Sequence, residues 1–273
     1  MPEGSGSPLG VAAPPGSAAP GGSAAPPDST VPRGAVGPTY GVADPDTVAA
    51  QYATPDRLRR RMSIWRPGPD GRTPRDVARD LVVGLAPRSV LEVGCGTGEL
   101  AEEIAAALPA CAYLATDASE SMVAATAARG LHAEVATIGS LPYPDASFDV
   151  VVAAWMLYHV PDLDAALAEV RRVLRPGGSF VAVTNGDRHL ARLLEDAGGD
   201  ILVTQFSSEN GEEALRRYFA RVAATHIATT AYFTDHTDAV AYLETVDESL
   251  AHGLAWFDGP RVEAGYTTVF HAR

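Results

Sequence analysis

Short apolar segments alternate with helical segments between residues 89 and 185, and this alternation limits the possible folds more than any other feature. The apolar, strand-like segments stand at 89–94, 111–117, 131–137, 148–155 and 179–185. Segments with the apolar spacing of amphipathic helices separate most of them, at 99–108, 119–130 and 163–174. Strands joined by crossover helices predict an α/β fold with a mostly parallel, doubly wound sheet.

Three glycines lie at alternate positions where the first of these strands meets the following helix. They are Gly94, Gly96 and Gly98. Glycine permits tight turns and leaves no Cβ between the backbone and a ligand, and the start of a helix adds unpaired amide groups. The dinucleotide spacing G-x-G-x-x-G requires a third glycine at position 99, where this chain has Glu99. The loop therefore indicates either a nucleoside site without a pyrophosphate or a tight turn without a ligand.

A carboxylate ends the next strand. Asp117 follows the segment CAYLAT, and an acidic side chain at this place can accept hydrogen bonds from both hydroxyls of a ribose. The alternative is a helix cap for the segment that starts at Ser119. The glycine loop one strand earlier favours ribose binding.

Three segments resemble, in order and spacing, the motifs of class I S-adenosylmethionine (SAM)-dependent methyltransferases of the small-molecule, type 11-like branch. They are VLEVGCGTGEL, ATDAS, and LPYPDASFDVVVAAWMLYHVPD followed by LRPGG. The resemblance covers roughly residues 85 to 185. It implies a Rossmann-like, seven-stranded sheet whose last strand, here 265–273, is antiparallel, and it implies SAM as the cofactor.

The resemblance also implies roles for individual residues. Gly94, Gly96 and Gly98 would pack beneath the methionine and ribose portions of SAM. Glu92 would order the loop and the amino group of the cofactor, and Asp117 would hold the ribose hydroxyls.

Further positions are implied around the adenine ring and the methyl group. Ala118 and Met122 would flank the adenine, and the backbone of Ile138 would lie beside it. Ala154 and Trp155 would lie near the methionine portion and the methyl group.

Two further positions concern the upstream helix and a departure from the family pattern. The upstream pattern YATPDRLRRR resembles an N-terminal helix of some bacterial members, which places Arg61 near the cofactor carboxylate. The family often has an acidic residue where this chain has Thr137, whose hydroxyl accepts a hydrogen bond without charge assistance.

Methyl transfer from a sulfonium needs positioning more than a strong catalytic dyad. Positioning alone contributes about 7 to 11 kcal/mol, and a base is needed only when the acceptor must lose a proton. His159 and Tyr158 are the candidate catalytic residues, His159 as a base and Tyr158 in the acceptor pocket, although a structural role is the alternative for each. Asp187 and His189, just past the fifth strand, are further candidates for contact with a substrate.

Composition narrows the function classes. Acidic residues outnumber basic ones 34 to 21, with a formal net charge of −13, which argues against nucleic acid as a partner. The two cysteines form neither a disulfide framework nor a zinc site, so no metal is predicted. We find no membrane span and no secretory signal, so the expected location is the cytoplasm.

These observations divide the chain into five predicted regions. They are a disordered Pro/Gly/Ala/Ser-rich tail at 1–38, N-terminal helices over the cofactor site at 39–88, the SAM-binding core at 89–186, a helical cap and substrate region with one strand at 187–256, and a terminal strand at 257–273.

The leading hypothesis for the function is methyl transfer to a small molecule by in-line displacement, as in the tailoring of a secondary metabolite. The alternatives are an RNA or protein methyltransferase and a SAM-binding protein without methyl transfer. The sequence indicates no oligomeric state.

Overall fold

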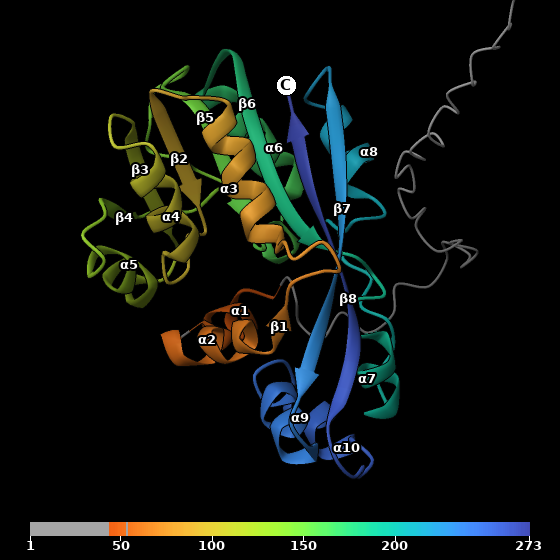
Figure 1. Cartoon of the computed structure of the whole chain (residues 1–273). Helices are drawn as coiled ribbons and strands as arrows, with labels where there is room; N and C mark the ends of the chain where they lie inside the picture. The colour runs from red at the N-terminus through yellow and green to blue at the C-terminus, as the bar shows by residue number, and fades with distance from the viewer. Residues whose placement is uncertain (1–43, 53) are drawn as a thin grey trace, which may run out of the picture. The chain divides into compact units, whose positions relative to one another are not determined.

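The computed structural model describes residues 44–52 and 54–273, so the predicted tail at 1–38 lies outside the described part. An eight-stranded sheet runs through this part in the order β1-β7-β8-β6-β5-β2-β3-β4 (Figure 1). The strands are β1 (Trp65–Arg66), β2 (Ser89–Val93), β3 (Ala112–Asp117), β4 (Ala133–Val135), β5 (Phe148–Ala154), β6 (Leu174–Asn185), β7 (Val222–Phe233) and β8 (Arg261–Ala272).

The pairing confirms the predicted Rossmann-like α/β fold. The strands β4, β3, β2, β5 and β6 pair in parallel, and β8 pairs antiparallel with both β6 and β7. The eighth strand, β1, was not predicted; it pairs with β7 at the edge of the sheet through Trp65↔Ala231 and Arg66↔Thr230. A strand of two residues is too short to produce an alternating pattern.

Helices cover both faces of the sheet. They are α1 (Pro45–Gln51), α2 (Pro55–Ser63), α3 (Pro74–Gly84), α4 (Glu99–Ala107), α5 (Glu120–Ala127), the 3₁₀ turn η1 (Leu157–His159), α6 (Leu163–Val173), α7 (Ala191–Asp196), α8 (Gly211–Arg216), α9 (His236–Leu243) and α10 (Glu248–Gly253). Apolar residues of α3 and α4 form one buried cluster with Val150 and Val152 of β5. Residues of α6 and α8 form another cluster with Val151 and Ala153. Alternate residues of β5 thus face opposite helix layers, as expected for a central strand.

The strands β7 and β8 extend beyond the parallel core. The register of β6 with β8 ends at Asn185↔Thr267, whereas β7 and β8 stay paired as far as Phe233↔Arg261. This extension carries α7, α9 and α10 (Figure 1) and a further buried cluster that includes Leu193 and Leu243. The region predicted as a cap therefore has a hydrophobic core of its own. No helix of the described residues is both long and apolar enough to span a membrane.

Candidate active site

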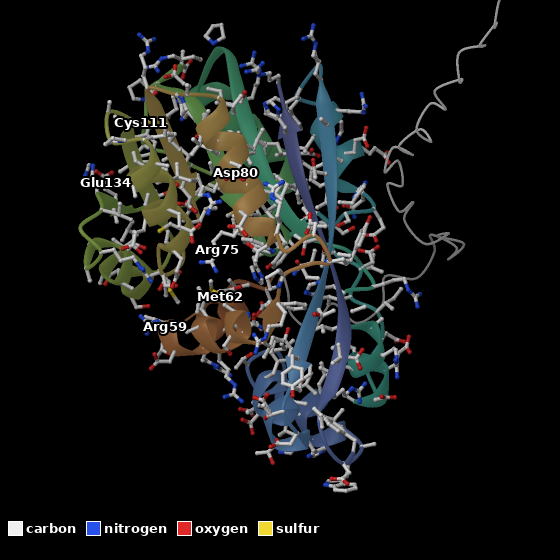
Figure 2. All side chains as sticks on the ribbon, viewed as in Figure 1. Arg59, Met62, Arg75, Asp80, Cys111 and Glu134 are labelled. Carbon is white, nitrogen blue, oxygen red and sulfur yellow. The ribbon has the colours of Figure 1, made fainter. Side chains whose placement is uncertain are left out.

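A cavity of about 1010 Å³ lies at the carboxyl ends of the parallel strands. Residues of β2, β3, β5, α1, α2, α7 and α9 contribute to its lining. Met62 of α2 and Arg75 of α3 both line it and are labelled in Figure 2. Since β2 is flanked by β3 on one side and β5 on the other, the cavity lies where the strand order reverses, which is the usual ligand site of an open α/β sheet.

The loop after β2 has a backbone that only glycine adopts easily. Gly94, Gly96 and Gly98 have φ values of 71°, 56° and 82°, in the left-handed region. A Cβ on Gly94 would lie 2.7 Å from Cγ of Met156, and a Cβ on Gly98 would lie 2.7 Å from Oγ1 of Thr126. The three glycines are therefore required by both conformation and space.

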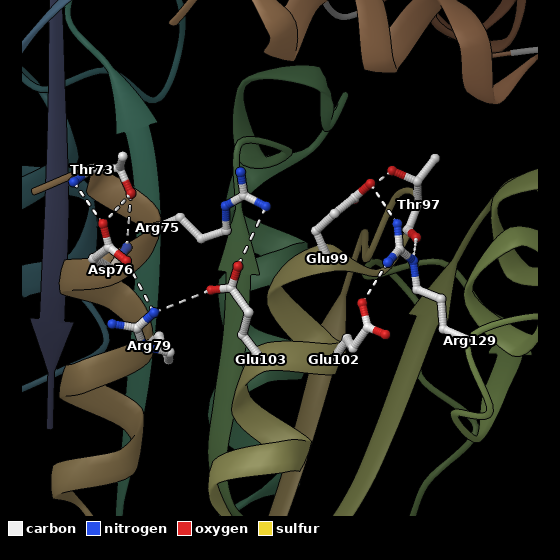
Figure 3. Close-up of polar contacts among 9 residues, drawn as sticks. All are labelled: Thr73, Arg75, Asp76, Arg79, Thr97, Glu99, Glu102, Glu103 and Arg129. Carbon is white, nitrogen blue, oxygen red and sulfur yellow. Dashed lines mark hydrogen bonds and ion pairs between the residues drawn. The ribbon is translucent and has the colours of Figure 1, made fainter. Parts of the chain in front are cut away.

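Arg129 anchors this loop from the segment after α5 (Figure 3). Its Nε donates to the Thr97 carbonyl oxygen at 2.6 Å, and its guanidinium pairs with Glu99 at 2.7 Å and with Glu102. Thr97 in turn donates its hydroxyl to Glu99 at 2.5 Å. Glu99 stands where the dinucleotide motif has its third glycine. The ion pair with Arg129 neutralises the negative charge of Glu99.

Asp117 joins the loop to the next helix. Its Oδ2 accepts from the Gly96 amide at 2.9 Å, and its Oδ1 accepts from the Ser119 amide at 2.9 Å. The carboxylate also lines the cavity. The N-cap of α5 is Ser119 rather than Asp117, so Asp117 binds the backbone just before the helix. Each carboxylate oxygen keeps a lone pair that could accept from a ligand. Burial raises the pKa of Asp117, although hydrogen bonds from the two amides oppose this effect.

Glu92 is a buried acid beside the same loop. Its side chain is 1% exposed, and its hydrogen-bond donor is the Tyr113 hydroxyl, at 2.6 Å. Burial raises the pKa of Glu92 to about 8, with further contributions from Asp117 and Glu99. A cation at this end of the cavity would favour the ionised form of the acid.

Most of the predicted site residues meet in this one cavity. Those in its lining are Arg61, Glu92, Gly94, Gly96, Asp117, Ala118, Ile138, Ala154, Trp155, Tyr158 and His159. Two lie outside it. Gly98 caps α4, and Met122 is fully buried in α5, so the cofactor contacts predicted for these two stay predictions.

Trp155 follows β5 in a strained conformation. Its φ is 55°, which is rare for a bulky residue. Its amide donates to the Val183 carbonyl at 2.8 Å, and its indole Nε1 donates to Oδ1 of Asn185 at 3.2 Å. These contacts to β6 hold the indole at the cavity wall.

Of the two candidate catalytic residues, His159 packs against Tyr52, which directly follows α1, and Tyr158 packs against His159. Nε2 of His159 lies 2.9 Å from the Tyr52 hydroxyl, and the rings of Tyr158 and His159 meet edge to face. Burial raises the pKa of both Tyr52 and Tyr158, so both phenols stay protonated at neutral pH. This tyrosine contact supplies the structural role that was the alternative for His159, and catalysis by either residue stays a prediction.

Arg61 reaches the cap as well as the cavity. Its Nε donates to Oγ1 of Thr245 at 3.2 Å, and its guanidinium also donates to the Thr245 carbonyl and lies over the Tyr52 ring. The remaining N–H groups of the guanidinium could still meet a carboxylate.

Sequence reasoning missed several lining residues. Tyr52, Trp65 and Asn185 line the cavity. Asn185 ends a predicted strand just as Asp117 does, so the same rule could have selected it. Of the two candidates past β6, His189 lines the cavity, whereas Asp187 does not belong to its lining.

Comparisons with known proteins agree with this geometry. A family model described as a methyltransferase domain matches residues 91–182. The chain is 35% identical over 142 residues to a demethylmenaquinone methyltransferase of Thermus thermophilus, covering 50% of this chain and 61% of that protein. It is 34% identical over 114 residues to an uncharacterized methyltransferase of Mycobacterium bovis, covering 40% and 56%. The chain thus spans little more than half the length of these relatives.

A solved structure shares the fold over most of the chain. The [4+2]-cyclase SpnF superposes with a TM-score of 0.52 at 20% identity, covering 88% of this chain and 97% of that one. The match at residues 91–182, the strand order and the glycine loop together support a class I SAM-dependent methyltransferase domain of the small-molecule type in this part of the chain.

Proposed function

We propose that this protein transfers a methyl group from SAM to a small-molecule acceptor. The observation that carries the proposal is the convergence of the glycine loop, Asp117 and Glu92 on one cavity that extends beyond them. When bound, SAM supplies an electrophilic methyl group on a sulfonium.

The residues of this cavity fit SAM in shape and charge. Gly94 and Gly96 line the cavity and have no side chain to occupy it. Glu92 and Asp117 are acids that face a ligand carrying a sulfonium and an ammonium group, and such a ligand would offset the cost of burying these carboxylates. Asp117 would hold the ribose hydroxyls.

The size and cover of the cavity support a small acceptor. Ligand cavities hold roughly 300 to 1,000 Å³, so about 1010 Å³ leaves room for a second ligand beside a nucleoside. The helices α1 and α2 are linked to the cap by Gln51, which donates to the Val246 carbonyl at 3.1 Å, and by an Arg60–Asp238 ion pair of 2.8 Å. The net charge of −13 opposes an RNA substrate.

Calorimetric titration with SAM and with S-adenosylhomocysteine (SAH) tests the cofactor site. We expect saturable binding of both, since both carry the adenosine and the amino acid portion that the cavity fits. A folded protein that binds neither ligand at about millimolar concentration, a level of weak affinity, contradicts the proposal. Binding of SAM without transfer to any acceptor would favour the alternative of a SAM-binding protein.

The raised pKa of Glu92 predicts that SAM binds more tightly as the pH rises from about 6 to 7.5. Its pKa is about 8 without a ligand, and a bound cation lowers it, so binding releases a proton and the affinity rises up to about tenfold per pH unit. The variant Glu92→Gln should show little of this dependence. Titrations in two buffers of different ionisation enthalpy measure the released proton.

The raised pKa of Glu92 also affects the stability of the ligand-free protein. The folded pKa is about 8 and the ordinary value is 4.5, so unfolding releases a proton between these values. The stability contributed by Glu92 is therefore present at low pH and is lost as the pH rises through this window. A pH dependence of SAM binding that is identical in Glu92→Gln and wild type contradicts the assignment.

A further inference from the structure

Beyond Trp155, towards β7, the cavity has apolar walls and a few polar atoms in fixed positions. Its lining includes Leu190, Leu194 and Leu202, which follow β6, and Trp65 of β1. We call this part, with Asn185 and His189, the distal half of the cavity. The charges of the cofactor half, Glu92 and Asp117, belong to β2 and β3 instead.

Asn185 presents a hydrogen-bond donor to the distal half. Its Oδ1 accepts from the indole of Trp155 at 3.2 Å and from the hydroxyl of Thr267 at 3.1 Å. An indole N–H can only donate, so the oxygen of the amide must face Trp155. The NH₂ group of Asn185, which lines the cavity, therefore remains as a hydrogen-bond donor for a ligand.

His189 is anchored through one ring nitrogen only. Its Nδ1 lies 3.1 Å from both the amide nitrogen and the carbonyl oxygen of Tyr266. An unprotonated Nδ1 accepts from the amide, and a protonated Nδ1 donates to the carbonyl. The ring thus keeps a backbone partner in every protonation state. Its other nitrogen, Nε2, remains for a ligand in the cavity, whose lining includes His189.

Trp65 supports the imidazole from the side. The two ring centroids are 4.4 Å apart with planes inclined by 34°. A Cβ on Gly265 would lie 2.4 Å from the indole of Trp65, so the indole rests directly on the backbone of β8. The short strand β1 and a glycine of β8 together fix the position of His189.

The environment of His189 suits proton acceptance. Burial lowers its pKa to about 4, against a smaller opposite effect of the Tyr266 carbonyl, and no charged side chain contributes to the shift. The imidazole is therefore neutral at neutral pH. A weak base suffices when the acceptor proton becomes strongly acidic as the new bond forms, and it suits a phenol better than an alkanol.

We propose that the distal half binds an uncharged aromatic acceptor with a hydroxyl group, and that His189 accepts the hydroxyl proton while Asn185 donates to the same oxygen. This inference rests on the proposed methyl transfer from SAM. The acceptor oxygen bonds to the methyl carbon, and the carbon–sulfur bond breaks with its electron pair kept by sulfur, which gives SAH. The hydroxyl proton moves to Nε2 of His189 and then to solvent. A charged acceptor is disfavoured because Asn185 and the neutral His189, the two groups that would contact its hydroxyl, carry no charge to offset the burial of a charged group.

The test uses 2-naphthol as acceptor and 2-naphthoate as its charged counterpart. We expect 2-naphthol to bind the SAH-loaded full-length protein and to be methylated in the presence of SAM, and 2-naphthoate to do neither. His189→Asn should lower kcat for 2-naphthol about 100-fold or more, within the range of general-base effects. His252→Asn, at an exposed position of α10, is the matched control and should retain the wild-type kcat.

The pH profile separates a proton acceptor from a packing residue. With a neutral base already in place, wild-type kcat should stay level between about pH 6 and 8. In His189→Asn only the ionised acceptor reacts, so kcat should rise about tenfold per pH unit. SAH affinity within about twofold of wild type shows that the variant is folded, a difference of about 0.4 kcal/mol.

The outcomes distinguish the two proposals. Protein that binds SAH but not 2-naphthol overturns the acceptor class. Equal kcat and equal pH profiles in wild type and His189→Asn overturn the role of His189. A protein that binds no SAH overturns the proposed function itself, and this inference with it.

Discussion

Asp117→Ala should weaken SAM binding by about 1.5 to 3 kcal/mol, or roughly 10- to 150-fold in Kd. The carboxylate would lose its hydrogen bonds to the ribose, and the Gly96 and Ser119 amides would lose an acceptor that now lies 2.9 Å from each. Calorimetric titration of both proteins with SAM measures the difference.

Two controls separate binding from folding in this experiment. Asp117→Asn keeps one carbonyl oxygen and the shape of the side chain, so its affinity should fall between those of wild type and Asp117→Ala. Asp258→Ala removes an exposed acid before β8 and should leave the affinity unchanged. If Asp117→Ala binds SAM as tightly as wild type, Asp117 acts only through its hydrogen bonds with the Gly96 and Ser119 amides.

Gly94→Ala should reduce the free energy of unfolding by about 2 to 5 kcal/mol. A φ of 71° is strained for alanine, at about 1 to 2 kcal/mol. The new methyl group would also lie 2.7 Å from Cγ and 2.8 Å from Cβ of Met156, and such overpacking costs about 1 to 3 kcal/mol. Denaturant titration monitored by circular dichroism measures the loss.

Gly130→Ala is the matched control for Gly94→Ala. Gly130 has a φ of 83°, yet a Cβ there would meet no atom within 4 Å. The variant Gly130→Ala should therefore lose only the free energy of unfolding that comes from backbone strain, about 1 to 2 kcal/mol. Equal losses in the two variants would show that Met156 moves aside without cost and that space at the loop is not limiting.

The sequence determined the central part of the fold because its signals are local. Alternating apolar strands and amphipathic helices between 89 and 185 predict the parallel sheet, and this sheet is observed. The glycine loop and Asp117 were identified as neighbouring strand ends, and parallel strands bring such ends to one edge. The hydrogen bond from Gly96 to Asp117 follows from that arrangement.

The tertiary structure alone decided the distal half of the cavity. Trp65 comes from a two-residue strand, and it meets His189 and Gly265 only because β7 and β8 continue past the parallel core. The anchoring of His189 by the Tyr266 backbone likewise joins residues that are far apart in the chain. Periodicity and motif spacing report the order within one segment, whereas contacts between distant segments depend on the packing of the whole sheet. For this reason the sequence by itself predicted the residues of the cofactor half, and only the folded chain brought together the residues of the distal half.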